Sequence, residues 1–215
     1  MQLGLRLVVS LLALVQEPKP APFEKEIEAF EAKDQAAPPP RGEIVFVGSS
    51  SIRFWKSTEA FPDLQIINRG FGGSQMSDSV RYAERIILPY APRIVVVFAG
   101  GNDVNAKKSP EQVADDFKAL VAKIHGALPK TKVYFISLFP NVQRRSQNPA
   151  CAKVNDLIEA FTKTDSRLGY IDTASRMRAE DGGPRPELLR PDGLHMNDDG
   201  YKIWNEIVGA LLRKP

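Results

Sequence analysis

The sequence of 215 residues has little of what several specialised classes of protein need. Its single cysteine, Cys151, excludes an intrachain disulfide and a cysteine-rich zinc site, and its two histidines lie far apart. Lys and Arg (29) barely exceed Asp and Glu (26) and are scattered, so no basic stripe for nucleic acid exists. No GxSxG segment, dinucleotide-binding glycine spacing or phosphate-loop lysine is present. We expect one domain without a metal, a cofactor or a nucleic-acid partner.

Long apolar stretches are equally scarce. The marked one is LVVSLLALV at residues 7–15, which is shorter than the roughly 20 residues that span a bilayer, so no membrane span is expected. It follows Arg6, and this order predicts a signal peptide over residues 1–16 and a secreted or periplasmic protein. No small-x-small cleavage site is evident near Val15, and a short N-terminal helix packed on the domain is the alternative reading.

Residues 17–42 are predicted to form a linker and one N-terminal amphipathic helix. Phe23, Ile27 and Phe30 fall at helical spacing, and the proline-rich segment AAPPPRG ends the pattern. We expect the helix to pack against the outside of the following domain's sheet; a partner-binding helix is the less favoured alternative.

Residues 43–215 alternate short β-branched runs with helical patterns, which is typical of a parallel sheet covered on both faces. Five runs predict strands at 44–48, 65–70, 93–100, 132–139 and 168–173, with helical faces at 76–87, 113–128 and 154–161 and a last helix from near Asn197. Ser109, Pro110 and Gln112 predict a capping box, and Asn148 before Pro149 predicts a second helix start. The fold class is therefore α/β.

Polar or glycine-rich segments follow these strands, where open parallel sheets bind their ligands. They read GSSSI, NRGFGGS and AGGNDV after the first three strands, and DGLH before the last helix. Each alone is a weak signal, because glycine and serine are common in turns. Together they supply what a serine nucleophile needs: a base, a group that orients the base, and donors for the oxyanion.

These four segments resemble the characteristic blocks of the SGNH, or GDSL-like, hydrolases. The first block is matched by Gly48, Ser49 and Ser50, the glycine block by Gly73, the third block by residues 100–103, and the last by Asp192 and His195. The resemblance spans residues 43–213 and marks 43–215 as an SGNH hydrolase domain. It implies a flavodoxin-like, three-layer α/β/α sandwich with a five-stranded parallel sheet.

The resemblance also implies the roles of the site residues. Ser50 would be the nucleophile, His195 the general base and then acid, and Asp192 the group that fixes the imidazole tautomer. The backbone N–H groups of Ser50 and Gly73 and the side-chain amide of Asn102 would form the oxyanion hole. Such chemistry needs no cofactor.

One position departs from the family pattern. Ser49 stands where the family usually has aspartate, which puts the hydrogen bonding of this turn in question. The departure also leaves three consecutive serines, and we assign the nucleophile to Ser50 rather than Ser51 because Ser50 lies two residues after Gly48.

The remaining polar candidates have ordinary structural explanations. Cys151 is expected to be a small buried residue, and His125 a surface cation near a helix C-terminus. Asp103 either stabilises its loop or belongs to the site. Arginines in two loops either favour an anionic or sugar-bearing ester or are ordinary solvated charges; they are Arg144, Arg145, Arg176, Arg178, Arg185 and Arg190.

Three functions follow as hypotheses. The first is a serine esterase for short acyl groups, such as acetyl groups on carbohydrate or another small ester. The second is a lysophospholipase or thioesterase, which the same apparatus permits. The third is a catalytically silent α/β binding protein, because a fold does not fix a function.

Overall fold

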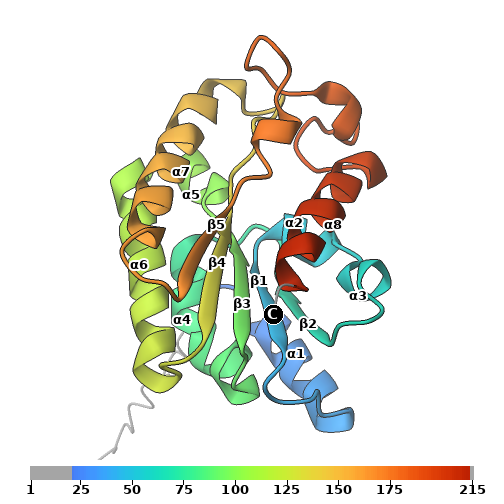
Figure 1. The fold of residues 1–215 in the computed structure, drawn as a ribbon, viewed down its shortest axis with the longest axis vertical. Coiled ribbons are helices and arrows are strands. Elements are labelled where there is room, and N and C mark those ends of the chain that lie inside the picture. Colours follow the sequence, from blue (N-terminus) through green and yellow to red (C-terminus); the bar gives the residue numbers. More distant parts are fainter. Residues whose placement is uncertain (1–20, 214–215) are drawn as a thin grey trace, which may run out of the picture.

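The computed structural model describes residues 21–213, so the predicted leader at 1–16 and residues 17–20 of the linker lie outside the described residues. A five-stranded parallel sheet lies between two layers of helices (Figure 1). Its strands are β1 (Ile44–Gly48), β2 (Ile66–Gly70), β3 (Ile94–Phe98), β4 (Lys132–Ile136) and β5 (Leu168–Ile171). This confirms the predicted three-layer α/β fold.

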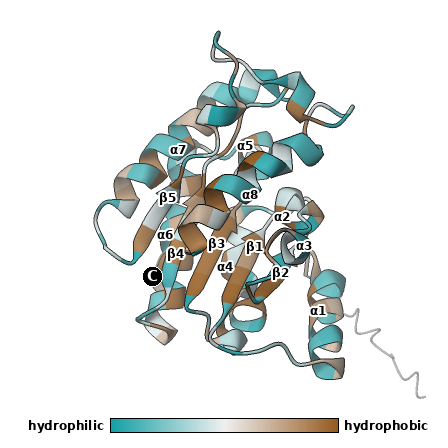
Figure 2. Cartoon of the chain, turned by 45° about the vertical axis from the view of Figure 1, so that its right-hand side comes forward, coloured by the Kyte–Doolittle hydropathy of each residue, from teal (hydrophilic) through white to brown (hydrophobic). Residues whose placement is uncertain are grey.

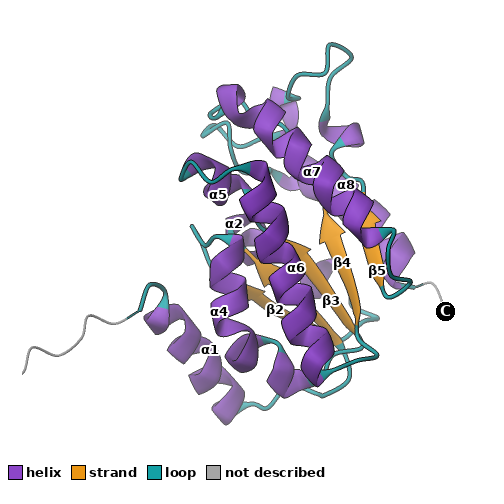
Figure 3. Cartoon of the chain, turned by 90° about the vertical axis from the view of Figure 1, so that its left-hand side faces the viewer, coloured by secondary structure: helices purple, strands orange, loops and turns teal. Residues whose placement is uncertain are grey.

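The longer helices follow the strands in alternation. They are α1 (Glu24–Ala36), α4 (Met76–Ile86), α6 (Pro110–Ala127), α7 (Asn148–Thr162) and α8 (Asp198–Leu212). Helices α4, α6 and α7 form one layer, in which α6 contacts both neighbours. Figure 3 shows this layer in front of the strands, with α8 behind them. The short helices α2 (Ser50–Phe54) and α3 (Ser57–Ala60) lie on the α8 side, and α5 (Gly101–Asn105) follows β3.

The sheet is the centre of the hydrophobic core. Every residue of β1 and β3 is buried, as expected for strands covered on both faces. Figure 2 shows the strands as an apolar layer, while teal residues gather on the outer sides of the helices. No helix among residues 21–213 combines the length and the apolar character needed to cross a membrane.

The strand order β2-β1-β3-β4-β5 determines where the site lies. From β1 the chain moves outward to β2 and then crosses back to β3 on the other side of β1. At this change of direction the loops after β1 and β3 diverge and leave a crevice at the carboxyl ends of the strands. The segments that contain Ser50 and Asn102 begin at this point.

Helix α1 forms as the spacing of Phe23, Ile27 and Phe30 predicts, with Ile27 fully buried. It packs against α4, where Arg85 donates to Glu31 at 2.7 Å, and its Phe30 ring lies 5.0 Å from the Arg69 guanidinium of β2. Asp34 accepts a hydrogen bond from Arg69 of β2, so α1 is also tied to the edge strand.

Two predicted details differ in the structure. The capping box at Ser109 is present, but Asn148 is not an N-cap, because α7 begins at Asn148 itself and Gln147 precedes it. The Asn148 side chain instead forms two hydrogen bonds to the backbone of Asn141. Strands β3 and β4 also end before residues 100 and 139, and the apolar residues beyond them continue unpaired toward the site.

Candidate active site

Ser50 is the first residue of α2 and follows β1 through a tight turn. Gly48 has a φ of 142°, and a Cβ there would lie 2.0 Å from the carbonyl oxygen of Phe98, so only glycine permits this close approach to β3. The Ser49 amide donates to the same Phe98 oxygen at 3.0 Å, and the Ser49 carbonyl accepts from two amides of α2. Because backbone groups hold the turn, a serine at position 49 is compatible with it.

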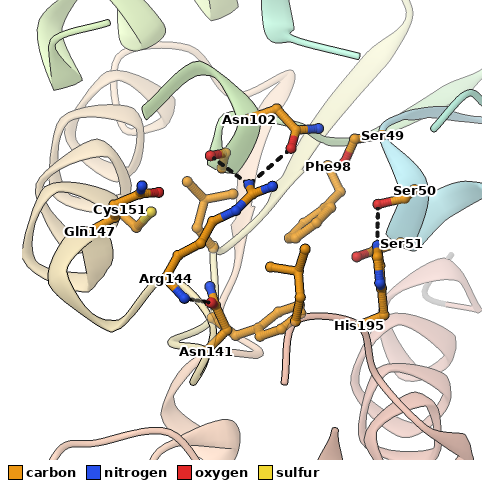
Figure 4. A pocket seen from close by; sticks show the side chains of 14 residues that line it. Ser49, Ser50, Ser51, Phe98, Asn102, Asn141, Arg144, Gln147, Cys151 and His195 are labelled. Carbon is orange, nitrogen blue, oxygen red and sulfur yellow. Dashed lines mark hydrogen bonds between the residues drawn. The ribbon is translucent and has the colours of Figure 1, made fainter. Parts of the chain in front are cut away.

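The structure brings Ser50, His195 and Asp192 together in a chain of hydrogen bonds. His195 Nε2 lies 2.9 Å from Ser50 Oγ (Figure 4), and His195 Nδ1 lies 2.7 Å from Asp192 Oδ2. A carboxylate only accepts, so Nδ1 carries the proton and Nε2 is left to accept from the Ser50 hydroxyl. This is the geometry that a general base needs toward its nucleophile.

Asp192 also builds the loop that presents His195. Its Oδ1 accepts from the backbone amides of Leu194 and His195, each at 2.9 Å. Burial alone raises the pKa of Asp192, but the bonds from the His195 ring and these two amides outweigh it and lower the pKa to about 2. The carboxylate is therefore ionised whenever the neutral imidazole can act as a base.

Three donors are the candidates for an oxyanion hole. The amides of Ser50 and Gly73 donate to no acceptor among residues 21–213. Gly73 has a φ of 84°, a backbone conformation that favours glycine. Asn102 donates from Nδ2 to the Ser74 carbonyl at 3.0 Å, and the second hydrogen of this amide remains available.

Arg144 fixes the orientation of the Asn102 amide. It donates to Asn102 Oδ1 at 3.0 Å and to the Gly101 carbonyl at 3.3 Å, as Figure 4 shows. A guanidinium has no acceptor, so the oxygen of Asn102 must face Arg144 and Nδ2 must point the other way. Arg144 forms no ion pair with a carboxylate of the described chain.

Asp103, which the sequence left open between two roles, stabilises its loop. It is fully buried and accepts from the Met76 amide at 3.0 and 3.1 Å and from Lys108 at 2.9 Å. Burial raises its pKa more than the bonds from Lys108 and Met76 lower it. The carboxylate thus links the start of α4, just after the Gly73 loop, to the segment that contains Asn102.

A small pocket opens beside Ser50 and His195. Its floor is apolar, with Phe98, Leu138 and Phe139, and the far wall in Figure 4 contains Arg144, Gln147 and Cys151. The cavity volume is about 50 Å³, whereas one buried water needs roughly 10–15 Å³ on this scale. The space therefore accommodates only a few non-hydrogen atoms.

The remaining polar residues that the sequence singled out have structural explanations or are exposed. Arg176 and Arg185 form exposed ion pairs with Glu206 and Glu187, and Arg145 is exposed. Cys151 is buried, and burial raises its pKa to about 11, so it is no thiol nucleophile. His125 lies in the last turn of α6 and contacts the Thr131 carbonyl at 2.9 Å.

Sequence reasoning missed one residue that contacts the base. The ring of Phe54, at the end of α2, meets the His195 ring edge to face at 5.2 Å, and Arg190 lies over Phe54 at 4.7 Å. Nothing in the spacing of Phe54 pointed to His195, because the two are joined by tertiary packing between α2 and a distant loop.

Comparison with known proteins places this geometry in a family. The model of the "GDSL-like Lipase/Acylhydrolase family" matches residues 54–203. The chain is 30% identical over 182 residues to the rat platelet-activating factor acetylhydrolase IB subunit alpha1, covering 80% of this chain and 75% of the relative. It is 26% identical over 154 residues to the isoamyl acetate-hydrolyzing esterase of Schizosaccharomyces pombe, covering 67% of this chain and 61% of the relative.

Solved structures agree on the fold. A GDSL-like lipase from Bacteroides thetaiotaomicron superposes with a TM-score of 0.73 at 22% identity, covering 86% of this chain and 96% of that chain. The family match covers most of the domain and begins just after the Ser50 turn. The chain belongs to the GDSL-like lipase/acylhydrolase family and is a hydrolase that acts on ester bonds.

Proposed function

We propose that this protein is a serine esterase that removes short acyl groups through a Ser50–His195–Asp192 triad. The observation that carries the proposal is the continuous chain from Asp192 Oδ2 through the His195 ring to Ser50 Oγ, with distances of 2.7 and 2.9 Å. In the first step Ser50 Oγ attacks the ester carbonyl carbon and His195 takes its proton. Asp192 stabilises the imidazolium that forms.

The tetrahedral intermediate places its negative oxygen among the amides of Ser50 and Gly73 and the free hydrogen of Asn102 Nδ2. His195 then gives its proton to the leaving alcohol oxygen, and the acyl group stays on Ser50. Water attacks this acyl-enzyme with His195 again acting as base, which releases the acid and restores Ser50.

The size of the pocket supports a short acyl group. A cavity of about 50 Å³ suits an acetyl group, which favours a short-acyl esterase over a lysophospholipase. Two relatives, the acetylhydrolase and the isoamyl acetate-hydrolyzing esterase, have names that refer to acetyl esters. Acetyl groups on carbohydrate are one such substrate class.

We also propose export, as the apolar run at residues 7–15 predicts. Expression of the full chain with a C-terminal tag, followed by fractionation and mass determination of the N-terminus, tests this. Removal of residues near 1–16 supports export; an intact N-terminus in the cytoplasm contradicts it.

The test of the activity is hydrolysis of p-nitrophenyl acetate, butyrate and octanoate by the mature chain. We expect activity that declines with chain length and that is lost in Ser50→Ala and His195→Ala. Ser51→Ala and His125→Ala are the matched controls and should keep the activity, with folding of all variants checked by circular dichroism. Activity in Ser50→Ala, or loss only in Ser51→Ala, would refute the assignment.

A further inference from the structure

A second hollow lies near the catalytic residues and shares no lining residue with the small pocket. It has a cavity volume of about 340 Å³ and lies between α2, α3 and the start of α8. We call it the Phe54 groove; its lining includes Phe54, Lys56, Glu59, Arg190, Lys202 and Asn205. On the scale used above, it has room for roughly twenty or more waters, many times that of the small pocket.

Phe54 joins the groove to the catalytic base. Its ring contacts the His195 ring at 5.2 Å and also lines the groove, and it is 38% exposed. Only Phe54 and Val142 are exposed large hydrophobic residues in the described part of the chain. Arg190 lies over one face of the ring at 4.7 Å, and the part that remains exposed is a surface that a ligand can cover next to the proposed base.

The direction of proton transfer assigns the two hollows to the two halves of an ester. His195 must protonate the leaving oxygen, so the alcohol extends from the His195 side of the ester carbon. Two of the proposed oxyanion donors, Ser50 and Asn102, line the small pocket, whose cavity volume is about 50 Å³. A bulky alcohol would therefore extend into the Phe54 groove.

The groove lining matches a polyhydroxylated ring. Lys56, Lys202 and Arg190 supply donors, while Glu59 and Asp198 supply acceptors, so no single charge sign dominates. Asn205 accepts from the Trp55 indole at 2.7 Å, which leaves its NH₂ group as a donor. Mixed donors and acceptors around an exposed aromatic ring suit hydroxyl groups combined with the C–H face of a sugar.

We propose that the Phe54 groove binds the alcohol half of the substrate, a sugar, while its acetyl-sized acyl group occupies the small pocket. This inference rests on the esterase proposed above and names its substrate class: short acyl esters of carbohydrate. Phe54 is then a specificity-determining residue, since it separates esters of bulky polyols from esters of small alcohols.

The test compares two acetyl esters, 6-O-acetylglucose and ethyl acetate, because only the first has an alcohol that reaches the groove. The wild-type protein should have the higher kcat/KM for the sugar ester. Phe54→Ala should lower the ratio of the two kcat/KM values about tenfold, chiefly through KM for the sugar ester. Phe54→Tyr should restore the ratio, and Val142→Ala, the other exposed apolar side chain, should leave it unchanged.

The outcomes separate the two proposals. If Phe54→Ala lowers kcat/KM by the same factor for both esters, Phe54 only supports His195. The groove assignment would then be wrong, and the esterase proposal would stand. Wild-type preference for ethyl acetate would also overturn the groove assignment. If the protein hydrolyses neither ester, both the esterase proposal and the groove assignment are wrong.

Discussion

The two sides of the catalytic centre are built in different ways. Ser50, Gly73 and Asn102 each follow a strand of the sheet, and the fully buried Asp103 links the start of α4, after the Gly73 loop, to the Asn102 segment. His195 comes from an irregular segment between β5 and α8 that contains only short 3₁₀ turns. The proposed nucleophile and oxyanion donors thus follow strands of the sheet, whereas the proposed base lies in an irregular loop segment.

The base side is held by local turns and a few backbone ties. The Gly193 carbonyl accepts from the amides of Val142 and Gln143 at 2.9 and 3.0 Å, and the His195 carbonyl accepts from Arg190 at 2.7 Å. The Asp192 side chain is 42% exposed, while that of Asp103 is fully buried. The two carboxylates therefore differ in setting: the exposed Asp192 is the proposed catalytic one, and the buried Asp103 stabilises the fold.

The largest expected effect is on the exposed carboxylate. Asp192→Asn should lower kcat for p-nitrophenyl acetate by roughly 10⁴-fold, the order seen when a triad aspartate becomes an amide and the imidazole adopts the wrong tautomer. The asparagine oxygen can still accept from the Leu194 and His195 amides, so the variant should stay folded, with a slightly lower melting temperature at neutral pH because the stabilising carboxylate charge is lost. Steady-state kinetics with thermal unfolding checks both; a folded variant with near-normal kcat would show that Asp192 does not orient His195.

The lowered pKa of Asp192 adds a test in pH. A depressed carboxyl pKa stabilises the fold fully above the ordinary value of 3.8, and this contribution disappears as the pH falls through about 2. Any stability difference between the wild type and Asp192→Asn should therefore be constant at neutral pH and shrink in strong acid. A difference that grows below pH 3.8 would contradict the assigned direction.

The next effect is on the buried carboxylate. Asp103→Ala leaves the Met76 amide without an acceptor in the core, which should cost about 2–3 kcal/mol of unfolding free energy, measured by urea denaturation. Lys108 keeps Asp116 as a partner, so its charge is not stranded. Asp115→Ala, which breaks an exposed pair with Lys118, is the matched control and should cost less than about 1 kcal/mol. Equal losses in both variants would contradict the division between the two sides.

The same contrast explains what the sequence could reveal. The strand at 44–48 was predictable to the residue, because a strand covered on both faces is apolar at every position. The edge strand predicted at 65–70 begins one residue later, at Ile66, and contains the polar Asn68 and Arg69. The predicted strand at 132–139 was too long, because Leu138 and Phe139 are buried under the pocket without pairing in the sheet. An apolar run in the sequence predicts that its residues are buried, but it does not predict which of them pair in the sheet.

The segments of the site were predictable, and the contacts between its loops were not. The positions of four polar or glycine-rich segments pointed to the carboxyl ends of the strands. The resemblance then assigned roles to Ser50, Gly73, Asn102, Asp192 and His195, and the structure places Ser50, His195 and Asp192 within hydrogen-bonding distance. The contact of Arg144 with Asn102 and that of Phe54 with His195 depend on loop conformation, and no periodicity in the sequence encodes it.

The smallest effect concerns Arg144, whose guanidinium donates a hydrogen bond to the Asn102 side chain. If Arg144 acts by fixing the Asn102 amide, Arg144→Met should lower kcat for p-nitrophenyl acetate about tenfold through loss of one charge-assisted hydrogen bond. Asn102→Ala alone should cost roughly 10²–10³ in kcat. Arg145→Met, an exposed neighbour, should have no effect.

The decisive measurement is the double variant. Because Arg144 contacts Asn102 directly, its loss should have no further effect in the Asn102→Ala background, so the two changes should be strongly non-additive. An arginine that instead binds the substrate would lower kcat/KM by the same factor in both backgrounds. Additive losses in kcat/KM would therefore show that Arg144 binds the substrate and does not position Asn102.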